Sequence, residues 1–141
     1  MPSTTPADLL THRRQLILDG DSDGFAALFA PDAVIELPFM GTPDAPARIE
    51  GSDAIREYAQ RVMASPLRLE ELEVTALHET QDPEVIVVEM RTRATLATTG
   101  KSFSVTSVQI LRIRDGFITL FRDFADPRVL AEITAEPRQE S

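Results

Sequence analysis

The sequence contains no cysteine and few basic residues. The lack of cysteine among 141 residues excludes disulfides, thiolate nucleophiles and cysteine-based metal sites. Lys and Arg number 14 against 23 Asp and Glu, which gives a net charge of −9, and no stretch concentrates the basic residues. Such a surface repels phosphates, so we expect no nucleic-acid partner. No apolar run approaches the length that spans a bilayer, so we expect no membrane partner either.

The first six residues also lack the basic and then apolar order of a signal peptide, so a cytoplasmic location is the default expectation. A hydrophobic fraction of 43% and a charged fraction of 26% are typical of an ordinary soluble protein. The length suits one domain with a proper core. We therefore expect a single domain over residues 1–141, with frayed polar ends at about 1–5 and 136–141.

Two periodicities divide the chain. Up to about residue 63, apolar residues recur mostly at helical spacing, and after Pro66 they alternate with polar ones. The first part predicts, in chain order, helices over 7–18 and 24–30, a strand over 33–39, a Gly- and Pro-rich loop over 40–50, and a helix over 54–63.

The second part predicts antiparallel strands joined by hairpin turns. These strands cover residues 69–78, 85–98, 102–114 and 117–125, and a last helix follows over 126–133. Helices at one end of the sequence and strands at the other indicate an α+β domain. A long curved sheet wrapped over its helices would form a cone whose apolar interior is a natural small-molecule pocket.

The last predicted strand carries charges where core residues are expected. Because side chains alternate between the faces of a strand, one face is predicted to hold Phe117, Thr119, Phe121 and Asp123, and the other Ile118, Leu120, Arg122 and Phe124. Neither face is solvated in this pattern, so at least one charge is expected to be buried. Burial beside aromatic rings raises the pKa of a carboxyl group toward the range useful for acid–base catalysis. Asp123 is therefore the first candidate for a catalytic residue.

Three segments together give the chain a family resemblance. They are residues 32–36 (DAVIE), 49–58 (IEGSDAIREY) and 121–127 (FRDFADP). In this order and spacing they resemble the SnoaL-like branch of the NTF2-like, or ketosteroid-isomerase-like, superfamily over about residues 7–133. The resemblance implies an α+β cone of helices against a strongly curved, mostly antiparallel sheet, commonly paired as a homodimer. This fold hosts isomerases, dehydratases, polyketide cyclases, epoxide hydrolases and non-catalytic binding modules, so it does not decide the function.

The catalytic groups of ketosteroid isomerases are not carried over. Their general-base Asp aligns with Leu37, their oxyanion-hole Tyr with Arg13 and their protonated Asp with Gln109. The resemblance therefore argues against steroid-type isomerisation by that machinery.

Limonene-epoxide-hydrolase-like proteins also align, and most of their charges are absent. Their Arg-x-Asp pair falls at Met90 and Thr92, and their Tyr and Asn fall at Ile35 and Leu37. Only the acid of the last strand is retained, as Asp123. SnoaL-type polyketide cyclases need less: one Asp acts as acid and base, and the pocket enforces the folded conformation of the substrate. Asp123 is the best match for that Asp.

The preferred interpretation is a small enzyme, without cofactor or metal, that cyclises or isomerises an apolar polyketide- or terpenoid-like metabolite with Asp123 as acid and base. In a cone fold, part of the core also forms the wall of the pocket, and methionine side chains there can adapt to varied ligands. Gln109 or Thr92 would guide polar groups of the substrate. The predicted substrate-binding residues are Leu37, Phe39, Met63, Met90, Thr92, Gln109 and Phe121.

Three alternatives stay open at this point. The first is a non-catalytic ligand-binding or interaction module, in which Asp123 is a structural carboxylate paired with an Arg or a backbone amide. The second, weaker alternative is an epoxide hydrolase. The third is a cyclase that works by shape alone and depends on Met90 or Phe121.

The remaining charged residues are expected on the outside. Arg122 is predicted to face away from the pocket, with Glu89 as a conceivable partner, and Glu36 to face away with Leu37 inside. His12 and His78 have no partners at metal-ligand spacing, so no metal site is predicted. Ion pairs with Glu residues are expected on the outer face of the sheet for Arg91, Arg93, Arg112 and Arg114.

Overall fold

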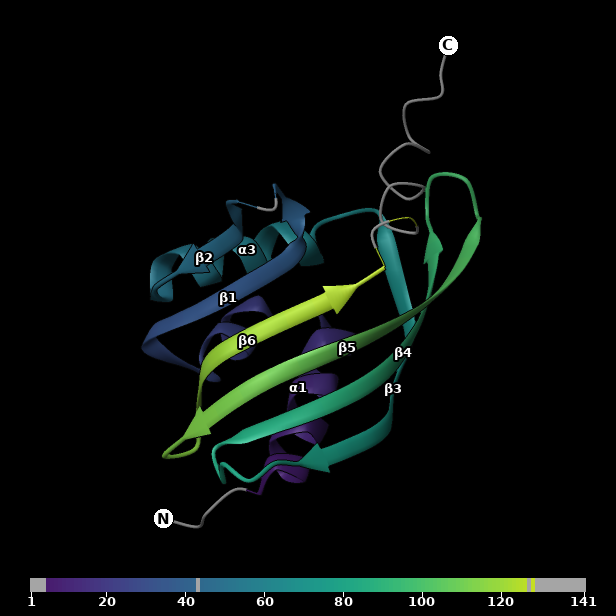
Figure 1. The fold of residues 1–141 in the computed structure, drawn as a ribbon. Coiled ribbons are helices and arrows are strands. Elements are labelled where there is room, and N and C mark those ends of the chain that lie inside the picture. Colours follow the sequence, from purple (N-terminus) through teal and green to yellow (C-terminus); the bar gives the residue numbers. More distant parts are fainter. Residues whose placement is uncertain (1–4, 43, 127, 129–141) are drawn as a thin grey trace.

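The computed structural model describes residues 5–42, 44–126 and 128 (Figure 1). The predicted last helix over 126–133 lies almost wholly outside these residues, as do the predicted frayed ends apart from Thr5. Within the described part, no helix is long and apolar enough to cross a membrane. The elements are α1 (Pro6–Asp19), α2 (Ser22–Ala26), β1 (Phe29–Gly41), β2 (Pro46–Glu50), α3 (Ser52–Met63), β3 (Leu67–Glu79), β4 (Val85–Leu96), β5 (Ser102–Arg114) and β6 (Phe117–Ala125).

The ends of α1 are set by local chemistry. The Thr5 hydroxyl accepts a hydrogen bond from the Asp8 backbone N–H at 3.1 Å, and Pro6 follows at the first helical position. Gly20 ends the helix in the left-handed conformation, with φ at 70°. Between these ends α1 buries Leu9, Leu10 and also Arg13.

The strands form one six-stranded sheet in the order β2-β1-β6-β5-β4-β3. Strands β3 to β6 pair as the antiparallel meander that the sequence predicts, and β1 joins β6 in parallel. The sequence-based prediction of a loop over 40–50 is wrong, because β2 pairs with β1 as a hairpin. Gly41, at φ 80°, makes the sharp turn, and Pro46 is tolerated because β2 is an edge strand.

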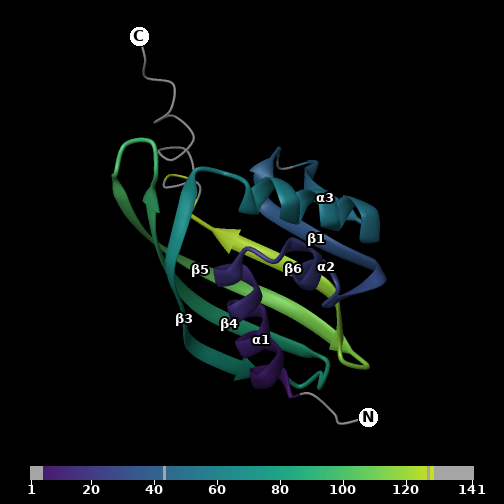
Figure 2. The same ribbon diagram turned by 180° about the vertical axis from the view of Figure 1, so that it is seen from behind.

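All three helices lie on the same face of the curved sheet, as Figures 1 and 2 show from opposite sides. The core fills the space between the two layers. Fully enclosed side chains include Ile35, Val88, Leu111 and Ile118 from the sheet and Ile55 from α3. The sheet curls around the helices without closing, since β2 and β3 remain its edges. The α+β architecture predicted from the sequence is confirmed.

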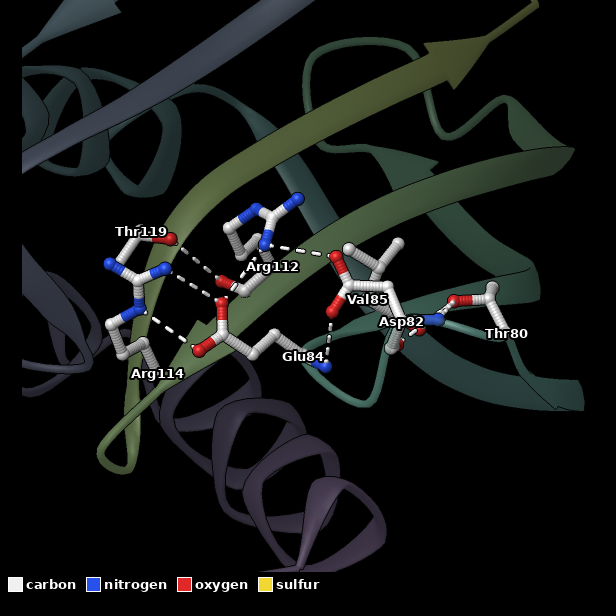
Figure 3. Close-up of polar contacts among 7 residues, drawn as sticks. All are labelled: Thr80, Asp82, Glu84, Val85, Arg112, Arg114 and Thr119. Carbon is white, nitrogen blue, oxygen red and sulfur yellow. Dashed lines mark hydrogen bonds and ion pairs between the residues drawn. The ribbon is translucent and has the colours of Figure 1, made fainter.

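The opposite face of the sheet carries the predicted ion pairs. Arg91 pairs with Glu73 and Arg93 pairs with Glu71 across β3 and β4. Arg112 and Arg114 of β5 share one carboxylate, that of Glu84 in the turn before β4, at N–O distances of 2.9 to 3.0 Å (Figure 3). The expectation of an ion-paired outer face is confirmed for these four arginines.

A β-bulge at Thr119 corrects the predicted faces of the last strand. Arg112 lies opposite Leu120 and Ile113 lies opposite Ile118, so Thr119 is one extra residue on β6. Its hydroxyl donates a hydrogen bond to the Arg112 carbonyl at 3.3 Å (Figure 3). The extra residue shifts the alternation, so Ile118 is buried while its neighbour Phe117 is 48% exposed. Phe117 therefore does not share a face with Phe121, contrary to the plain alternation.

Candidate functional site

A cavity of about 580 Å³ lies between the helices and the inner face of the sheet. This volume is in the range of about 300–1,000 Å³ that small-molecule sites occupy. Side chains of α1, α3 and strands β3 to β6 line it. Apolar and aromatic residues make up much of the wall, including Phe25, Met63, Met90, Phe103 and Phe121.

Most of the predicted site residues meet at this cavity. Asp123 lines it, and so do Met63, Met90, Thr92, Gln109 and Phe121. Leu37 and Phe39 are not among the described lining residues.

The structure does not bring Leu37 and Phe39 of the predicted substrate-binding set to this cavity. Leu37 is half-buried and packs against the core. Phe39 is 56% exposed, and its ring lies 5.6 Å from that of Phe124. The pairing of β1 with β2 shifts register between Leu37 and Gly41, and such an irregularity changes which way the following side chains point.

Asp123 is held in an environment that disfavours its charge. Its Oδ1 atom is enclosed and has no hydrogen-bond partner among the described residues, and the residue lines the cavity. Burial raises the pKa of Asp123 from 3.8 to about 6, against the opposing effects of the Arg13 charge and a side-chain hydrogen bond from Gln109. Near neutral pH the group therefore exchanges readily between acid and carboxylate, which suits it to accept and return a proton.

Arg13 brings a second charge into the same cavity from α1. Its side chain is almost fully buried, at 3% exposed, and its Nη2 donates to Oε1 of Gln109 at 2.7 Å. The same nitrogen contacts Sδ of Met90 at 3.2 Å, and the guanidinium lies 5.3 Å from the centre of the Phe121 ring. Burial lowers the pKa of Arg13 to about 10, and the charge of Asp123 partly opposes this effect. Arg13 therefore stays cationic at neutral pH.

Gln109 links the two charges. It lies directly opposite Asp123 in the pairing of β5 with β6, and its carbonyl oxygen is occupied by Arg13. Its amide group is therefore the side that faces the carboxylate, as a donor. The three residues form a polar line, from α1 through β5 to β6, inside a mostly apolar cavity.

Tyr58 of α3 adds a phenol to the lining. Burial, followed by the charge of Asp123, raises the pKa of Tyr58 to about 12, and Arg61 partly opposes the shift. The phenol therefore keeps its proton throughout the neutral range and presents an O–H donor.

A SnoaL-like domain model matches residues 13–121, which is most of the chain. The chain belongs to the SnoaL-like domain family. This confirms the resemblance seen in the sequence. An uncharacterised PhzA/B-like protein of Pseudomonas aeruginosa is 31% identical over 85% of this chain and 83% of its own length.

Solved structures show the same fold. A Bacillus subtilis protein proposed to be an isomerase matches with a TM-score of 0.82 at 23% identity, over 92% of this chain and 91% of that one. SalBIII, described as an epoxide hydrolase/cyclase-like enzyme with a role in pyran ring formation, matches with a TM-score of 0.71 at 21% identity, over 87% and 92%. A Mycobacterium tuberculosis protein in complex with estradiol-17β-hemisuccinate matches with a TM-score of 0.71 at 20% identity, over 86% and 93%. These likenesses establish the ketosteroid-isomerase-like, NTF2-like fold of this SnoaL-like domain.

Two residues of this SnoaL-like cavity, Arg13 and Tyr58, were not predicted as site residues from the sequence. A signal existed for Arg13, because it falls at helical spacing with Leu9 and Leu16 on the apolar side of its helix. A cation at such a position is either a satisfied core group or part of a site, and the pattern alone does not separate the two. Tyr58 carries no comparable signal, since a tyrosine on an amphipathic helix is ordinary.

Arg122 and the residues suggested as its neighbours form ion pairs outside the cavity. Arg122 faces away from it, as predicted, but its partner is Glu36, with Nε of Arg122 2.7 Å from a Glu36 oxygen. The suggested partner Glu89 instead contacts the His78 ring at 2.7 Å. Register explains the correction, because Glu36 lies beside Arg122 where β1 and β6 run parallel.

Among the described residues, no group of three or more His, Asp or Glu side chains is arranged to hold a metal ion. Four side chains characterise the candidate site: one acid with a raised pKa, one buried cation, an amide between them and a protonated phenol.

Proposed function

We propose that this SnoaL-like domain is a small, cofactor-independent enzyme that isomerises or cyclises an apolar polyketide- or terpenoid-like metabolite. Asp123 is its acid and base. The observation that carries the proposal is the environment of Asp123: an enclosed Oδ1 without a partner, a pKa near 6 and a position on a ligand-sized cavity with apolar walls. Perturbed acids in such cavities are candidates for catalysis.

The chemistry needs only proton transfer and positioning. The Asp123 carboxylate removes a proton from a carbon next to a carbonyl group, and the electron pair moves into that carbonyl to give an enolate. In an isomerisation, Asp123 returns the proton to a different carbon. In a cyclisation, the enolate carbon attacks a second carbonyl of the same molecule, and Asp123 gives its proton to the resulting alkoxide oxygen. Both routes return Asp123 to the carboxylate and consume no other reactant.

The other polar groups suit this scheme. The phenol of Tyr58 is a donor that favours negative charge on a substrate oxygen as the enolate forms, and the Arg13 cation lines the same cavity. Met90, Thr92 and Phe121 supply the wall that holds the substrate in its reactive conformation. The related enzyme SalBIII, by its description, acts in ring formation, which supports the cyclase class. Epoxide hydrolysis is less well supported, because Met90 and Thr92 offer no charge to orient a water molecule.

We also propose that two chains pair through the outer face of the sheet. This face carries a partly exposed apolar patch next to its ion pairs, which includes Phe39 at 56% exposed, Val108 at 38% exposed, and Phe124. Val108 lies opposite Phe124 in the β5–β6 pairing, so the patch is continuous across the two strands. The cavity lies on the other face, so this pairing leaves it accessible. A cytoplasmic location remains part of the proposal.

Hydrogen–deuterium exchange tests the acid–base role without knowledge of the natural substrate. The probe is β-tetralone, an apolar bicyclic ketone with exchangeable protons next to its carbonyl, incubated with the protein in D₂O and followed by NMR. We expect the protein to accelerate the exchange and Asp123→Asn to reduce that acceleration by about 100-fold or more, since acid–base catalysis contributes about 10²–10⁴-fold. Asp115→Asn, in an exposed turn, is the matched control and keeps full acceleration.

Two results would count against the enzyme. If Asp123→Asn exchanges the ketone as fast as the parent, Asp123 is not the base. If the parent binds β-tetralone, seen as line broadening of the ketone signals, without accelerating exchange, the cavity belongs to a binding module.

A further inference from the structure

The guanidinium of Arg13 is a buried cation without an anionic contact. None of the described residues forms an ion pair with it, and its protein acceptors are the neutral Gln109 and Met90. Both contacts use Nη2. The Nε and Nη1 donors have no acceptor among the described residues. Arg13 itself lines the cavity, so a ligand there can reach its guanidinium.

We propose that Arg13 is the specificity residue of the cavity and binds a carboxylate of the substrate, so that the ligands of this site are apolar carboxylic acids. The inference rests on the proposed function in taking the cavity as the substrate site, and it adds the chemical class of that substrate.

The charge balance of the cavity favours an anionic ligand. A desolvated cation is costly unless a partner compensates it. Asp123 is an incomplete partner, because it makes no ion-pair contact with Arg13 and its own burial favours the neutral acid. Whenever Asp123 is protonated, the buried polar end of the cavity around Arg13 and Gln109 carries a net positive charge, while the other charged lining residues, Asp19 and Arg68, are exposed and opposite in sign. A carboxylate on the ligand supplies the missing anion and accepts hydrogen bonds from the free N–H groups, an arrangement that is stronger than a neutral hydrogen bond.

The shape of the cavity indicates which end of the ligand enters first. Its polar end is deep, since Arg13, Ser107 and Gln109 are all buried. Its rim is formed by exposed residues that include Pro66, Arg68 and Ala97. The acid group of the ligand therefore points inward, and the hydrocarbon part extends along the apolar wall toward the rim.

The test compares two fluorescent probes that share one hydrocarbon skeleton. Pyrenebutyric acid carries a carboxylate, and pyrenebutanol carries a neutral hydroxyl in its place. Both dissociation constants are measured by fluorescence titration with the intact chain at pH 5.5, where Asp123 is mostly the neutral acid and the carboxyl group of the probe is mostly ionised. We expect the acid to bind the unmodified protein at least about 10-fold more tightly than the alcohol, which corresponds to about 1.4 kcal/mol.

Two variants assign that preference to one side chain. Arg13→Met keeps a long unbranched side chain without the charge and is expected to abolish the preference for the acid, whereas Arg13→Lys retains part of it. Arg14→Met is the matched control. Arg14 is the next residue of the same helix, its Nε donates to the Leu72 carbonyl at 2.8 Å, and it does not line this cavity. The control is expected to keep the full preference.

The outcomes separate the two proposals. Equal binding of both probes by the unmodified protein overturns the inference about Arg13 and leaves the exchange test of Asp123 standing. A preference for the acid that survives in Arg13→Met also overturns the inference, because another cation is then responsible. If neither probe binds, the inference about Arg13 fails, and the β-tetralone exchange test decides the proposed function on its own. The comparison in the unmodified protein remains decisive even if Arg13→Met does not fold.

Discussion

Replacing Asp123 with asparagine should make the protein more stable at neutral pH. The change removes an ionisable group from a site that disfavours its charge and keeps nearly the same size and shape. Burial raises the pKa of Asp123 from 3.8 to about 6. At about 1.36 kcal/mol for each pKa unit, the folded protein gives up about 3 kcal/mol of stability when the group ionises.

The sign of the pH dependence follows from the raised pKa. Between pH 4 and pH 6 the folded state holds the Asp123 proton more tightly than the unfolded state does, so the stability contributed by the neutral acid is complete below pH 3.8 and is lost as the pH rises through about 6. Asparagine cannot ionise and has no such loss. The difference in unfolding free energy, Asp123→Asn minus parent, should therefore increase by about 2.4 kcal/mol between pH 4 and pH 8.

Urea unfolding at several pH values measures this difference directly. Taking the difference between variant and parent cancels the effect of the other carboxylates, which matter in a chain with a net charge of −9. Asp115→Asn, in its exposed turn, should show a difference that stays nearly constant with pH. The reasoning is refuted if the Asp123→Asn difference is equally constant. It is also refuted if the parent gains stability over the variant as the pH rises, because that is the behaviour of an ion-paired carboxylate.

Three further predictions concern other parts of the molecule. Tyr58 is the single tyrosine of the chain, so phenolate absorbance reports its ionisation alone. The phenol should ionise near pH 12 in the parent and at a lower pH in Asp123→Asn, and an unchanged titration would show that Asp123 does not act on Tyr58. Gly41→Ala should lower the free energy of unfolding by about 1–3 kcal/mol in urea unfolding, because the new Cβ would lie 2.6 Å from the Ala45 carbonyl oxygen. Gly100→Ala, which has open space around the new Cβ, should lower it less, and equal losses of stability in the two variants would contradict the clash. Val108→Lys, on the outer face, should dissociate the proposed dimer in sedimentation experiments and leave the binding of pyrenebutyric acid intact. A parent protein that sediments as a monomer would exclude the pairing.

Periodicity was enough to predict most of the fold. The strands from residue 67 onward are long and alternate regularly, and a strong repeated pattern leaves little competition from other structures. The missed strand β2 has only five residues and begins with a proline, so its local sequence favours a loop. It forms because β1 offers a free edge beside it, which is a tertiary effect.

The site was harder to predict because its geometry depends on irregularities. Asp123 was identified from chemistry, as a charge in an apolar strand. Plain alternation also placed Phe117 on its face, and the bulge at Thr119 changes that. Nothing local requires this extra residue, and it is stabilised by a partner strand. Arg13 reaches Gln109 across 96 positions of sequence, a distance over which spacing carries no information.

The position of β6 in the sheet has a consequence for how the chain folds. The strand lies between β1 and β5, so it is the only link in the described sheet between the β1–β2 hairpin and the β3–β4–β5 meander. Its contacts with β1 join residues as far apart as Phe29 and Ile118, and closing such a long loop before any contact forms slows folding. During synthesis the two halves of the sheet cannot join until residues 117–125 have left the ribosome. The same segment carries Asp123, so a partly folded chain in which β6 is not yet paired lacks both the link between the two halves and the acid of the cavity.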